Sequence, residues 1–448
     1  MKLYDREIST LYEQGRTIHL WSIFFPKLLE LVSISLLGNI HSMLLANFDE
    51  EAAVAVSVGS QVLSIFYIIL NIFSNGHLII SSIYLGANKR KEAGISACSV
   101  LTVSVVLSII LGALLAMFPQ PFMHMMHLDG IAFQYGCTYL SIMIGFSVFN
   151  VFNACFNSFL ISIGQAKCVL WVNLLRNLLS IAFGYIVLFR PFETPLYGVS
   201  GIAIGRVLSQ AIAAAVAAFF VVKRRCPFEH KIQTRAIISA GKIGLPGSMG
   251  NLSYTFSQTV ASSMISSLGL HMISAKVFAT NILGFVANFS SSIADSNSIL
   301  IGRCKGKGDY DRAGKLFMQN LLIALCMNLS LVLLINFFRV PLFRLFTTDP
   351  SILALIWQIA LIDIFVEAAR AINHIAERSL IATADVRFVT AVSTSSCWLV
   401  SIGLGWLFGI GLGLGLVGFW IAFAADEVVR CCAYLIRWHK GRWKNIRI

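Results

Sequence analysis

The chain has 448 residues, of which 57% are hydrophobic and only 12% carry charge, and its formal net charge is +13. Soluble domains carry about 25% charged residues, so this composition excludes an ordinary soluble enzyme. Apolar runs recur along the whole length, which predicts a membrane protein with many spans.

Each apolar run is long enough to cross a bilayer as a helix, which takes roughly 20 residues. We predict twelve such helices, joined by loops too short to hold a nucleotide-binding or catalytic domain. The predicted helices cover residues 18–46, 52–85, 93–118, 131–163, 169–189, 198–222, 236–268, 273–301, 312–338, 351–382, 388–410 and 413–436.

Sequence motifs of other protein classes are missing. The chain has no GxxxxGK[ST] motif, which argues against an ATP-driven pump, and neither HExxH nor GxSxG. Its ten cysteines form no CxxC pair, and we interpret them as small hydrophobic residues rather than disulfides or metal ligands. We therefore expect no catalytic residue, no cofactor and no enzymatic activity.

Positive charge is concentrated on one side of the predicted topology. The N-terminal tail and the loops after even-numbered helices carry 24 of the 34 Lys and Arg residues, and the opposite loops carry three. Cytoplasmic loops hold the Lys and Arg excess, so both termini are expected in the cytoplasm. The basic loops thus indicate orientation and contact with membrane lipid, not nucleic-acid binding. We expect a multi-pass plasma-membrane protein, in a bacterial inner membrane.

The two halves of the chain repeat each other at a near-constant offset. Pro26 matches Pro246 and Gly86 matches Gly306, each 220 residues apart. Each half has six spans, so the halves are parallel repeats about an axis along the membrane normal. We predict an all-α membrane protein with two pseudo-symmetric six-helix bundles around a central cleft. The bundles cover 1–222 and 236–448, the latter with a short basic tail, and a cytoplasmic linker covers 223–235.

Several stretches resemble the multidrug and toxic compound extrusion (MATE) family. They include FPKLLELVSISLLGNI with its proline, KIGLPGSMGNL, ILIGRCKGKGDYDRAG and DIFVEAARAINHIAERSLIATADVRF. The resemblance covers essentially the whole chain. It implies a secondary active antiporter that works by alternating access. Such a protein expels drugs or organic, often cationic, metabolites in exchange for Na⁺ or H⁺, and a transported Na⁺ is the only metal expected.

The predicted helix 351–382 carries a charged stripe. Asp363, Glu367, Arg370, His374 and Glu377 are spaced 4, 3, 4 and 3 residues apart and therefore share one helix face. A charge at the centre of a membrane helix costs about 2.5–3.5 kcal/mol on insertion scales, so the stripe cannot face lipid. Glu367 and Asp363 are candidates for ion coupling, because a buried carboxylate can bind Na⁺ or hold a proton.

Other polar residues of the C-terminal half extend this candidate site. Asp295 is the lone acid of span 273–301 and is a third coupling candidate. A supporting polar network is predicted from Arg370, Asn373, His374, Asp426, Glu427 and Arg430, although these charges could instead only neutralise one another and fix the helices. The candidates for lining a cavity in this half are Asn251, Thr255, Gln258, Asn281 and Asn288, with helix–helix adhesion as the simpler alternative.

The N-terminal half lacks the corresponding acids. The resemblance implies an aspartate in the first and the fifth helix of many proton-coupled members, and here His41 and Ile181 stand at those positions. Asn177 matches the fifth-helix motif, and we include His41 and Asn177 among the cavity-lining candidates. Our hypothesis is that ion coupling has moved to the C-terminal half.

Two other functions remain open at this point. A flippase for a lipid-linked precursor, as in distant relatives, would be favoured by a basic cleft, whereas the acids in the spans argue against it. A non-transporting scaffold or receptor is also conceivable, because paired buried charges can be purely structural. The expected partners are a small organic substrate and membrane lipid, and the protein is expected to be a monomer.

Overall fold

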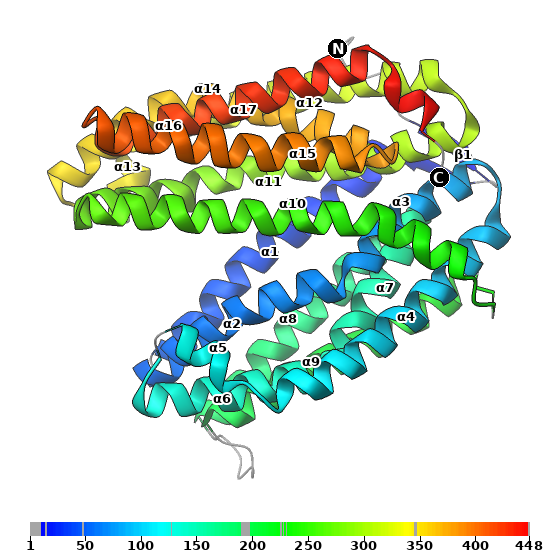
Figure 1. The fold of residues 1–448 in the computed structure, drawn as a ribbon, viewed down its shortest axis with the longest axis horizontal. Coiled ribbons are helices and arrows are strands. Elements are labelled where there is room, and N and C mark those ends of the chain that lie inside the picture. Colours follow the sequence, from blue (N-terminus) through cyan, green and yellow to red (C-terminus); the bar gives the residue numbers. More distant parts are fainter. Residues whose placement is uncertain are drawn as a thin grey trace. The chain divides into compact units, whose positions relative to one another are not determined.

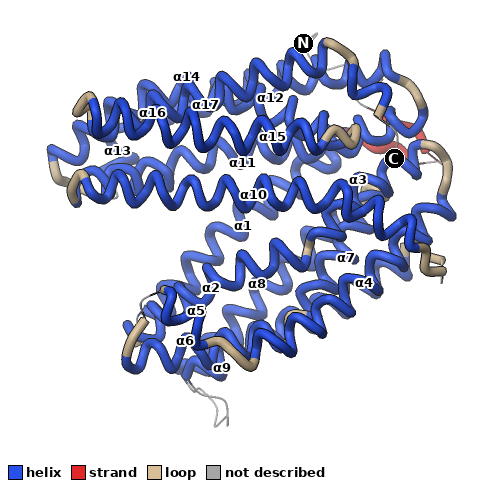
Figure 2. The backbone as a smooth tube through the Cα atoms, viewed as in Figure 1, coloured by secondary structure: helices blue, strands red, loops and turns tan. Residues whose placement is uncertain are grey.

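A computed structural model describes residues 10–13, 16–46, 49–126, 128–189, 198–224, 226, 228–229, 231–344 and 347–446. Within these ranges, the side chains of residues 10–18, 35–46 and 50 lie outside the description. The described chain is almost entirely helical (Figures 1 and 2), which confirms the all-α membrane fold expected from composition.

The first part of the chain forms one short hairpin and then a series of helices. The hairpin pairs β1 (Thr10–Glu13) with β2 (Arg16–His19) in antiparallel register, an element that the apolar pattern did not predict. The helices are α1 (Leu20–Ala46), α2 (Glu50–Leu70), α3 (Ile72–Gly86), α4 (Arg90–Ala116), α5 (Gln120–Met125), α6 (Gly130–Gly145), α7 (Val148–Ser162), α8 (Ala166–Phe189) and α9 (Gly198–Lys223).

The second part is again a series of helices, and its first two, α10 and α11, are the longest described. They are α10 (Thr234–Ser267), α11 (Leu270–Lys307), α12 (Tyr310–Phe337), α13 (Arg339–Arg344), α14 (Pro350–Ala382), α15 (Val386–Ser396), α16 (Gly403–Gly405) and α17 (Gly415–His439). Two π-helical stretches, η1 (Cys397–Ile402) and η2 (Trp406–Gly411), flank α16, and a 3₁₀ turn, η3 (Arg442–Asn445), follows α17.

Eight of these helical segments are long and apolar enough to cross a membrane, or nine if α6 and α7 form one span bent by 50°. This result applies to the described residues and to length and composition alone. Eleven of the twelve predicted spans coincide with one or two helical segments, and 388–410 coincides with four. The predicted spans 52–85 and 131–163 are interrupted, at Asn71 and at residues 146–147, and 388–410 contains the π-helical stretches.

The chain forms two compact units, and the boundaries between them lie within helices rather than in a loop. Unit 1 comprises Met1–Leu28 and Pro246–Ile448, and unit 2 comprises Leu29–Leu245. Both divisions lie next to the prolines inside α1 and α10, Pro26 and Pro246. Proline removes a helical hydrogen bond and weakens the helix locally. The linker boundary expected at 223–235 stays a prediction.

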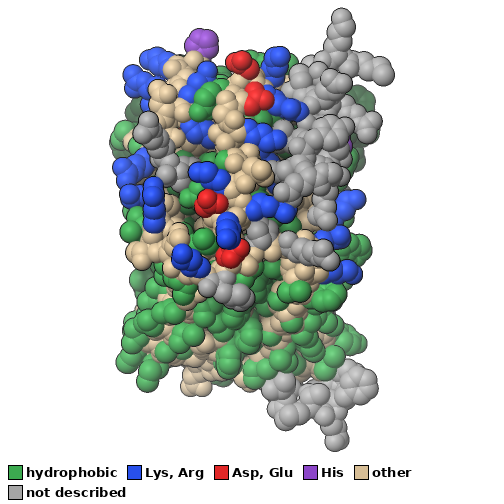
Figure 3. All heavy atoms as spheres, turned by 90° about the vertical axis from the view of Figure 1, so that its right-hand side faces the viewer, with side chains coloured by type: hydrophobic (Ala, Val, Ile, Leu, Met, Phe, Trp, Pro, Cys, Tyr) green, Lys and Arg blue, Asp and Glu red, His purple; other side chains and the backbone are tan. Residues whose placement is uncertain are grey.

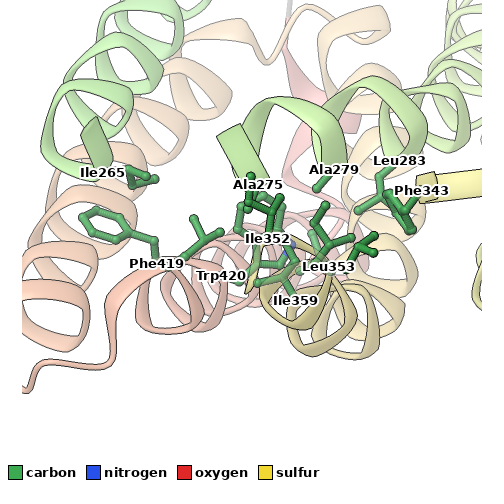
Figure 4. Close-up of a cluster of buried hydrophobic side chains, with 13 residues drawn as sticks. Ile265, Ala275, Ala279, Leu283, Phe343, Ile352, Leu353, Ile359, Phe419 and Trp420 are labelled. Carbon is green, nitrogen blue, oxygen red and sulfur yellow. The ribbon is translucent and has the colours of Figure 1, made fainter. Parts of the chain in front are cut away.

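The apolar core of unit 1 explains how α14 is held. α14 packs against α11, α12 and α17 (Figure 1). Figure 4 shows the buried cluster at one end of these helices, where Ile352 and Ile359 of α14 contact side chains of α11 and α17. Its buried members are Ile265, Ala275, Ala279, Leu283, Phe343, Ile352, Leu353, Ile356, Ile359, Val366, Leu416, Phe419 and Trp420.

Unit 2 is held partly by very close helix approach. A Cβ at Gly76 of α3 would lie 2.0 Å from the carbonyl oxygen of Ala240, and one at Gly244 would lie 1.8 Å from that of Ile72. Only glycine fits at these two positions, so α3 meets the first part of α10 backbone to backbone, as small residues permit in membrane helices.

Basic side chains predominate among the charged groups in one view of the chain. Lys and Arg side chains outnumber Asp and Glu on the face shown in Figure 3. A Lys and Arg bias of this kind is the feature from which orientation was predicted. The cytoplasmic placement of the termini stays a prediction.

Candidate functional site

Three helices place the carboxylates of the charged stripe inside unit 1. α14 begins at Asp349, whose side chain accepts a hydrogen bond from the backbone N–H of Ser351 and so caps the helix. Further along α14, Glu367 is 0% exposed and Asp363 is 3% exposed. The stripe therefore faces the interior of the unit, between α12 and α17, and not lipid.

Arg370 joins the acids of two helices. One of its Nη atoms pairs with the Oε1 atom of Glu367, one turn earlier on α14. Its Nε atom donates to the Oε1 atom of Glu427 on α17 at 3.2 Å. The other carboxylate oxygen of Glu427 accepts from Asn373 Nδ2 at 2.6 Å. α14 and α17 are thus tied by charge-assisted hydrogen bonds, which are stronger than neutral ones.

A second guanidinium completes the network on α17. Arg430 Nη2 donates to Asp426 Oδ2 at 2.5 Å and lies 3.3 Å from Glu427 Oε1. Ser396 of α15 donates to the other oxygen of Asp426 at 2.5 Å. The ring of Tyr254, from α10, lies 5.9 Å from the Arg430 guanidinium. Six of the predicted charged residues therefore belong to one buried region: Asp363, Glu367, Arg370, Asp426, Glu427 and Arg430.

Asp363 has the least compensation of the four acids. Its Oδ1 accepts from the indole N–H of Trp420 at 3.0 Å, and its Oδ2 is buried with no hydrogen-bond partner among the described residues. Glu367 accepts from Asn328 Nδ2 of α12 at 3.1 Å. The amide oxygens of Asn328 and Asn373 are likewise buried and without a donor within the described structure. Acceptors therefore exceed donors here.

Charge does not balance in this buried region. Four carboxylates, of Asp363, Glu367, Asp426 and Glu427, face two guanidiniums, of Arg370 and Arg430. With all six ionised the region would carry two uncompensated negative charges. An uncompensated charge in a low-dielectric interior is costly. Within this set of six side chains, carboxylates outnumber guanidiniums by two.

Two other candidate residues have their hydrogen-bond or ion-pair partners outside this network, although His374 interacts electrostatically with Glu427. Asp295 of α11 pairs with Arg378 at 3.2 Å, and both side chains are partly exposed. His374 is half-buried, and its Nδ1 lies 3.0 Å from Ser290 Oγ and 3.3 Å from Ser291 Oγ. In the described part of the chain, no three His, Cys, Asp or Glu side chains are grouped so as to hold a metal ion.

The cavity-lining candidates are less buried than the acids. Asn251 and Thr255 of α10 and Asn281 of α11 are exposed, whereas Gln258, Asn288 and Asn177 are half-buried. The hydroxyl of Thr255 donates to the carbonyl of Asn251 in its own helix. The structure brings none of these six side chains into a hydrogen bond with the charge network. The side chain of His41 lies outside the described residues.

Sequence reasoning missed the partners that come from other helices. Asn328, Trp420 and Ser396 each bond a carboxylate of the network. Asn328 was visible as a lone amide in an apolar run. For the tryptophan and the serine no sequence signal exists, because which side chains meet depends on how the helices are rotated.

At two places the halves make equivalent contacts, but the residues that make them differ in charge. The residues 220 positions before Asn328 and Glu367 are Ser108 and Ser147, whose hydroxyls lie 3.0 Å apart. Asn153 corresponds in the same way to Asn373, and its Nδ2 donates to the backbone oxygen of Gln210 at 2.8 Å. The two halves therefore share these contacts, and the acids are confined to the second half.

Relatives match this chain over most of its length. An uncharacterized transporter, YisQ of Bacillus subtilis (strain 168), is 30% identical over 437 residues, covering 96% of this chain and 95% of its own. A probable multidrug resistance protein, NorM of Thermotoga maritima, is 23% identical over 435 residues, covering 94% and 91%.

Solved structures share the fold. One is an outward-facing multidrug resistance MATE family transporter of the MOP superfamily, with a TM-score of 0.85, 17% identity and 95% coverage of both chains. Another is a MOP superfamily transporter from Pyrococcus furiosus, described as having a binding pocket of reverse polarity that suggests a different function. Its TM-score is 0.82, with 18% identity and coverage of 95% of this chain and 96% of that one.

The MatE family model matches residues 26–186 and again residues 246–407. The two matches begin 220 residues apart, which is the offset found between the repeated motifs. They cover most of the chain, so the protein belongs to the MATE family of membrane transporters.

Proposed function

We propose that the protein is a secondary active efflux transporter, which exports drugs or organic metabolites in exchange for Na⁺ or H⁺. The coupling ion acts at the buried charge network of unit 1. The observation that carries the proposal is the excess of two carboxylates over guanidiniums, together with the unpartnered oxygen of Asp363. The names of relatives such as NorM support drug export.

The chemistry of the network suits a reversible cation. A proton on Asp363 or Glu367 would reduce the excess negative charge and add the donor that the buried acceptors lack. A Na⁺ ion would require oxygen ligands, and the side-chain oxygens of Asp363 and Asn328 are both free to supply them within the described structure. Either ion stabilises this arrangement, and its release leaves the acids uncompensated.

Ion binding is coupled to transport if the inward-open and outward-open states bind this ion with different affinity. A ligand shifts a conformational equilibrium only by its differential affinity for the two states. Arg370 is suited to report ion occupancy, because it is shared between Glu367 and Glu427 on two helices. Neutralising Glu367 would leave Arg370 to Glu427 and change how α14 is tied to α17.

Other properties belong to the same proposal. The protein works without a cofactor and without enzymatic activity, as a monomer in the inner membrane of a bacterium, with both termini in the cytoplasm. The bacterial relatives and the Lys and Arg bias support this placement. The flippase alternative is not favoured, because the relatives are transporters named for multidrug resistance.

The test is flux in liposomes that contain the purified protein. Efflux of ethidium is followed under a Na⁺ gradient and then under a pH gradient, for wild type, Asp363→Asn and Glu367→Gln. We expect gradient-driven flux in the wild type, and flux at the rate of protein-free liposomes in both variants. Asp349→Asn is the matched control, because asparagine also caps helices and the position is outside the network.

Each half of the proposal has its own contradicting result. If neither gradient drives flux through the wild type, antiport is wrong. If flux is gradient-driven but equal in Asp363→Asn, Glu367→Gln and wild type, then coupling does not take place in this network.

A further inference from the structure

Unit 2 contains a separate set of charges inside its helices that the coupling network does not use. Arg176 lies near the middle of α8, and Arg206 lies within the span of α9. Among the described acids of residues 29–245, Glu30 of α1 is the one placed inside a span, since the others lie at helix ends or in loops. Basic groups therefore exceed acids inside this unit, which is the opposite of unit 1.

Arg206 is surrounded by neutral groups. Its Nη1 atom donates to the hydroxyl of Tyr139 on α6 and, at 3.4 Å, to the Oγ atom of Ser60 on α2. Its guanidinium carbon lies 5.6 Å from the centre of the Tyr139 ring. Among the described side chains, no carboxylate lies within ion-pair distance of Arg206. Arg206 as a residue is half-buried.

Glu30 compensates Arg176 rather than Arg206. Arg176 interacts electrostatically with Glu30 and with Tyr67 of α2. Glu30 is buried and accepts a hydrogen bond from Asn173 Nδ2, one turn before Arg176, at 2.7 Å. Because Glu30 interacts with Arg176, the positive charge of Arg206 has no acidic partner in the described part of the unit.

Further polar groups lie near Arg206. The Tyr67 hydroxyl is buried near both guanidiniums, with the Gln210 side chain beside it, although the two do not reach strict hydrogen-bond geometry. Gln210 lies one turn after Arg206 on α9. Hydroxyl, amide and guanidinium donors from α2, α6 and α9 therefore gather in one place.

The internal repeat shows that this polarity is specific to unit 2. The residue 220 positions after Arg176 is Ser396, and the residues 217 positions after Arg206 and Gln210 are Phe423 and Glu427. Both arginines thus stand where the second half is neutral, and a neutral amide stands where the second half is acidic. Corresponding parts of the two bundles carry opposite charge.

We propose that unit 2 contains a binding site for an organic anion, in which the Arg206 guanidinium pairs with a carboxylate beside Tyr139 and Ser60. Guanidinium matches carboxylate geometry with two parallel hydrogen bonds. A membrane-embedded cation without an acidic partner is costly, and a bound carboxylate removes that cost. The tyrosine rings accept the apolar body of the ligand. The substrates would then include carboxylates and zwitterions. This assignment rests on the transport function proposed above.

The test is binding of two fluorescent probes that differ in charge alone. Dansylglycine carries a carboxylate, and dansylglycinamide is its neutral amide. Fluorescence titration of the purified full chain in detergent, without any ion gradient, compares wild type, Arg206→Gln, Arg206→Lys and Tyr139→Phe. Arg387→Gln, which removes an exposed arginine at the start of α15, is the matched control.

We expect wild type and Arg387→Gln to bind dansylglycine more tightly than its amide. Arg206→Gln should weaken binding of the acid about 10- to 100-fold, as is typical for the loss of a hydrogen bond to a charged group, and leave the amide unchanged. Arg206→Lys and Tyr139→Phe should give intermediate losses, which keeps the test informative if Arg206→Gln does not fold. Equal binding of the two probes, no binding of dansylglycine, or an acid preference that survives in Arg206→Gln overturns the proposal.

A lipid headgroup offers the same anionic chemistry as a soluble carboxylate. Repeating the titration in phosphatidylcholine nanodiscs with and without phosphatidylglycerol separates the two sources. Displacement of dansylglycine by phosphatidylglycerol assigns the anion site to lipid, and an unchanged titration assigns it to the soluble anion. If gradient-driven flux fails while the acid preference stands, the transport proposal falls and the site remains. If flux stands and the probes bind equally, only the site falls.

Discussion

Arg370 is predicted to be the most sensitive residue of the charge network. Removing it as Arg370→Met would leave four buried carboxylates facing one guanidinium, so the charge imbalance would rise from two to three. Removing one partner of a buried ion pair costs about 3–5 kcal/mol. Because the Arg370 side chain is 21% exposed, we expect a loss of about 3 kcal/mol in the free energy of unfolding, at the lower end of that range.

Glu367→Gln should behave differently, although it removes the other member of the same pair. It lowers the charge imbalance, and Arg370 keeps its bond to Glu427 at 3.2 Å. The new amide oxygen can still accept from Asn328. We expect a change within about 1 kcal/mol. In the double variant, neutralising Glu367 should recover about 1–2 kcal/mol of the Arg370→Met loss, as contacting residues in one network couple.

The assay is unfolding of the purified protein by SDS titration in mixed micelles, followed by tryptophan fluorescence. Arg378→Met is the control, because its ion pair with Asp295 is partly exposed and should be worth less than about 1 kcal/mol. The reasoning is refuted if Arg370→Met costs no more than Arg378→Met. It is also refuted if Glu367→Gln fails to reduce the cost of Arg370→Met.

Two further predictions concern packing in unit 1. A Cβ at Gly409 would lie 2.4 Å from the ring of Phe419, so Gly409→Ala should destabilise by about 1–3 kcal/mol. The same change at Gly411, where the nearest atom is 3.6 Å away, should cost clearly less, and equal melting temperatures for the two variants would contradict the packing. Trp443 is buried and stacks on Trp438 with ring centres 4.4 Å apart. Trp443→Ala should free the C-terminal segment, seen as faster trypsin cleavage there and nowhere else, and an unchanged digestion pattern would count against this.

The helices could be predicted from the sequence to the extent that apolar length determines them. A break inside an apolar run leaves no mark in hydropathy, which is why the interruption at Asn71 and the 50° bend between α6 and α7 were not foreseen. The hairpin of residues 10–19 was missed for the related reason that it contains no apolar run.

The candidate site was predictable within a helix and not between helices. Spacing along α14 places Asp363, Glu367 and Arg370 on one face, and the structure shows that face buried. Trp420 could not be linked to Asp363, because that contact depends on the rotation and depth of α17 relative to α14. Arg206 lies inside the predicted helix 198–222, but its neutral surroundings become visible only when α2 and α6 are placed beside α9.

The paired contacts Ser108–Ser147 and Asn328–Glu367 have a consequence for the history of the chain. A homodimer of a single six-helix protein carries the same residue at both symmetry-related positions, because one gene encodes both subunits. Only after the gene is duplicated can position 147 stay serine while position 367 becomes glutamate. The difference in charge between the two halves is therefore available to a duplicated protein and not to a symmetric ancestor. Gene duplication, on this view, made a division of labour between the bundles accessible to selection, and fusion keeps the two unlike bundles together in one chain.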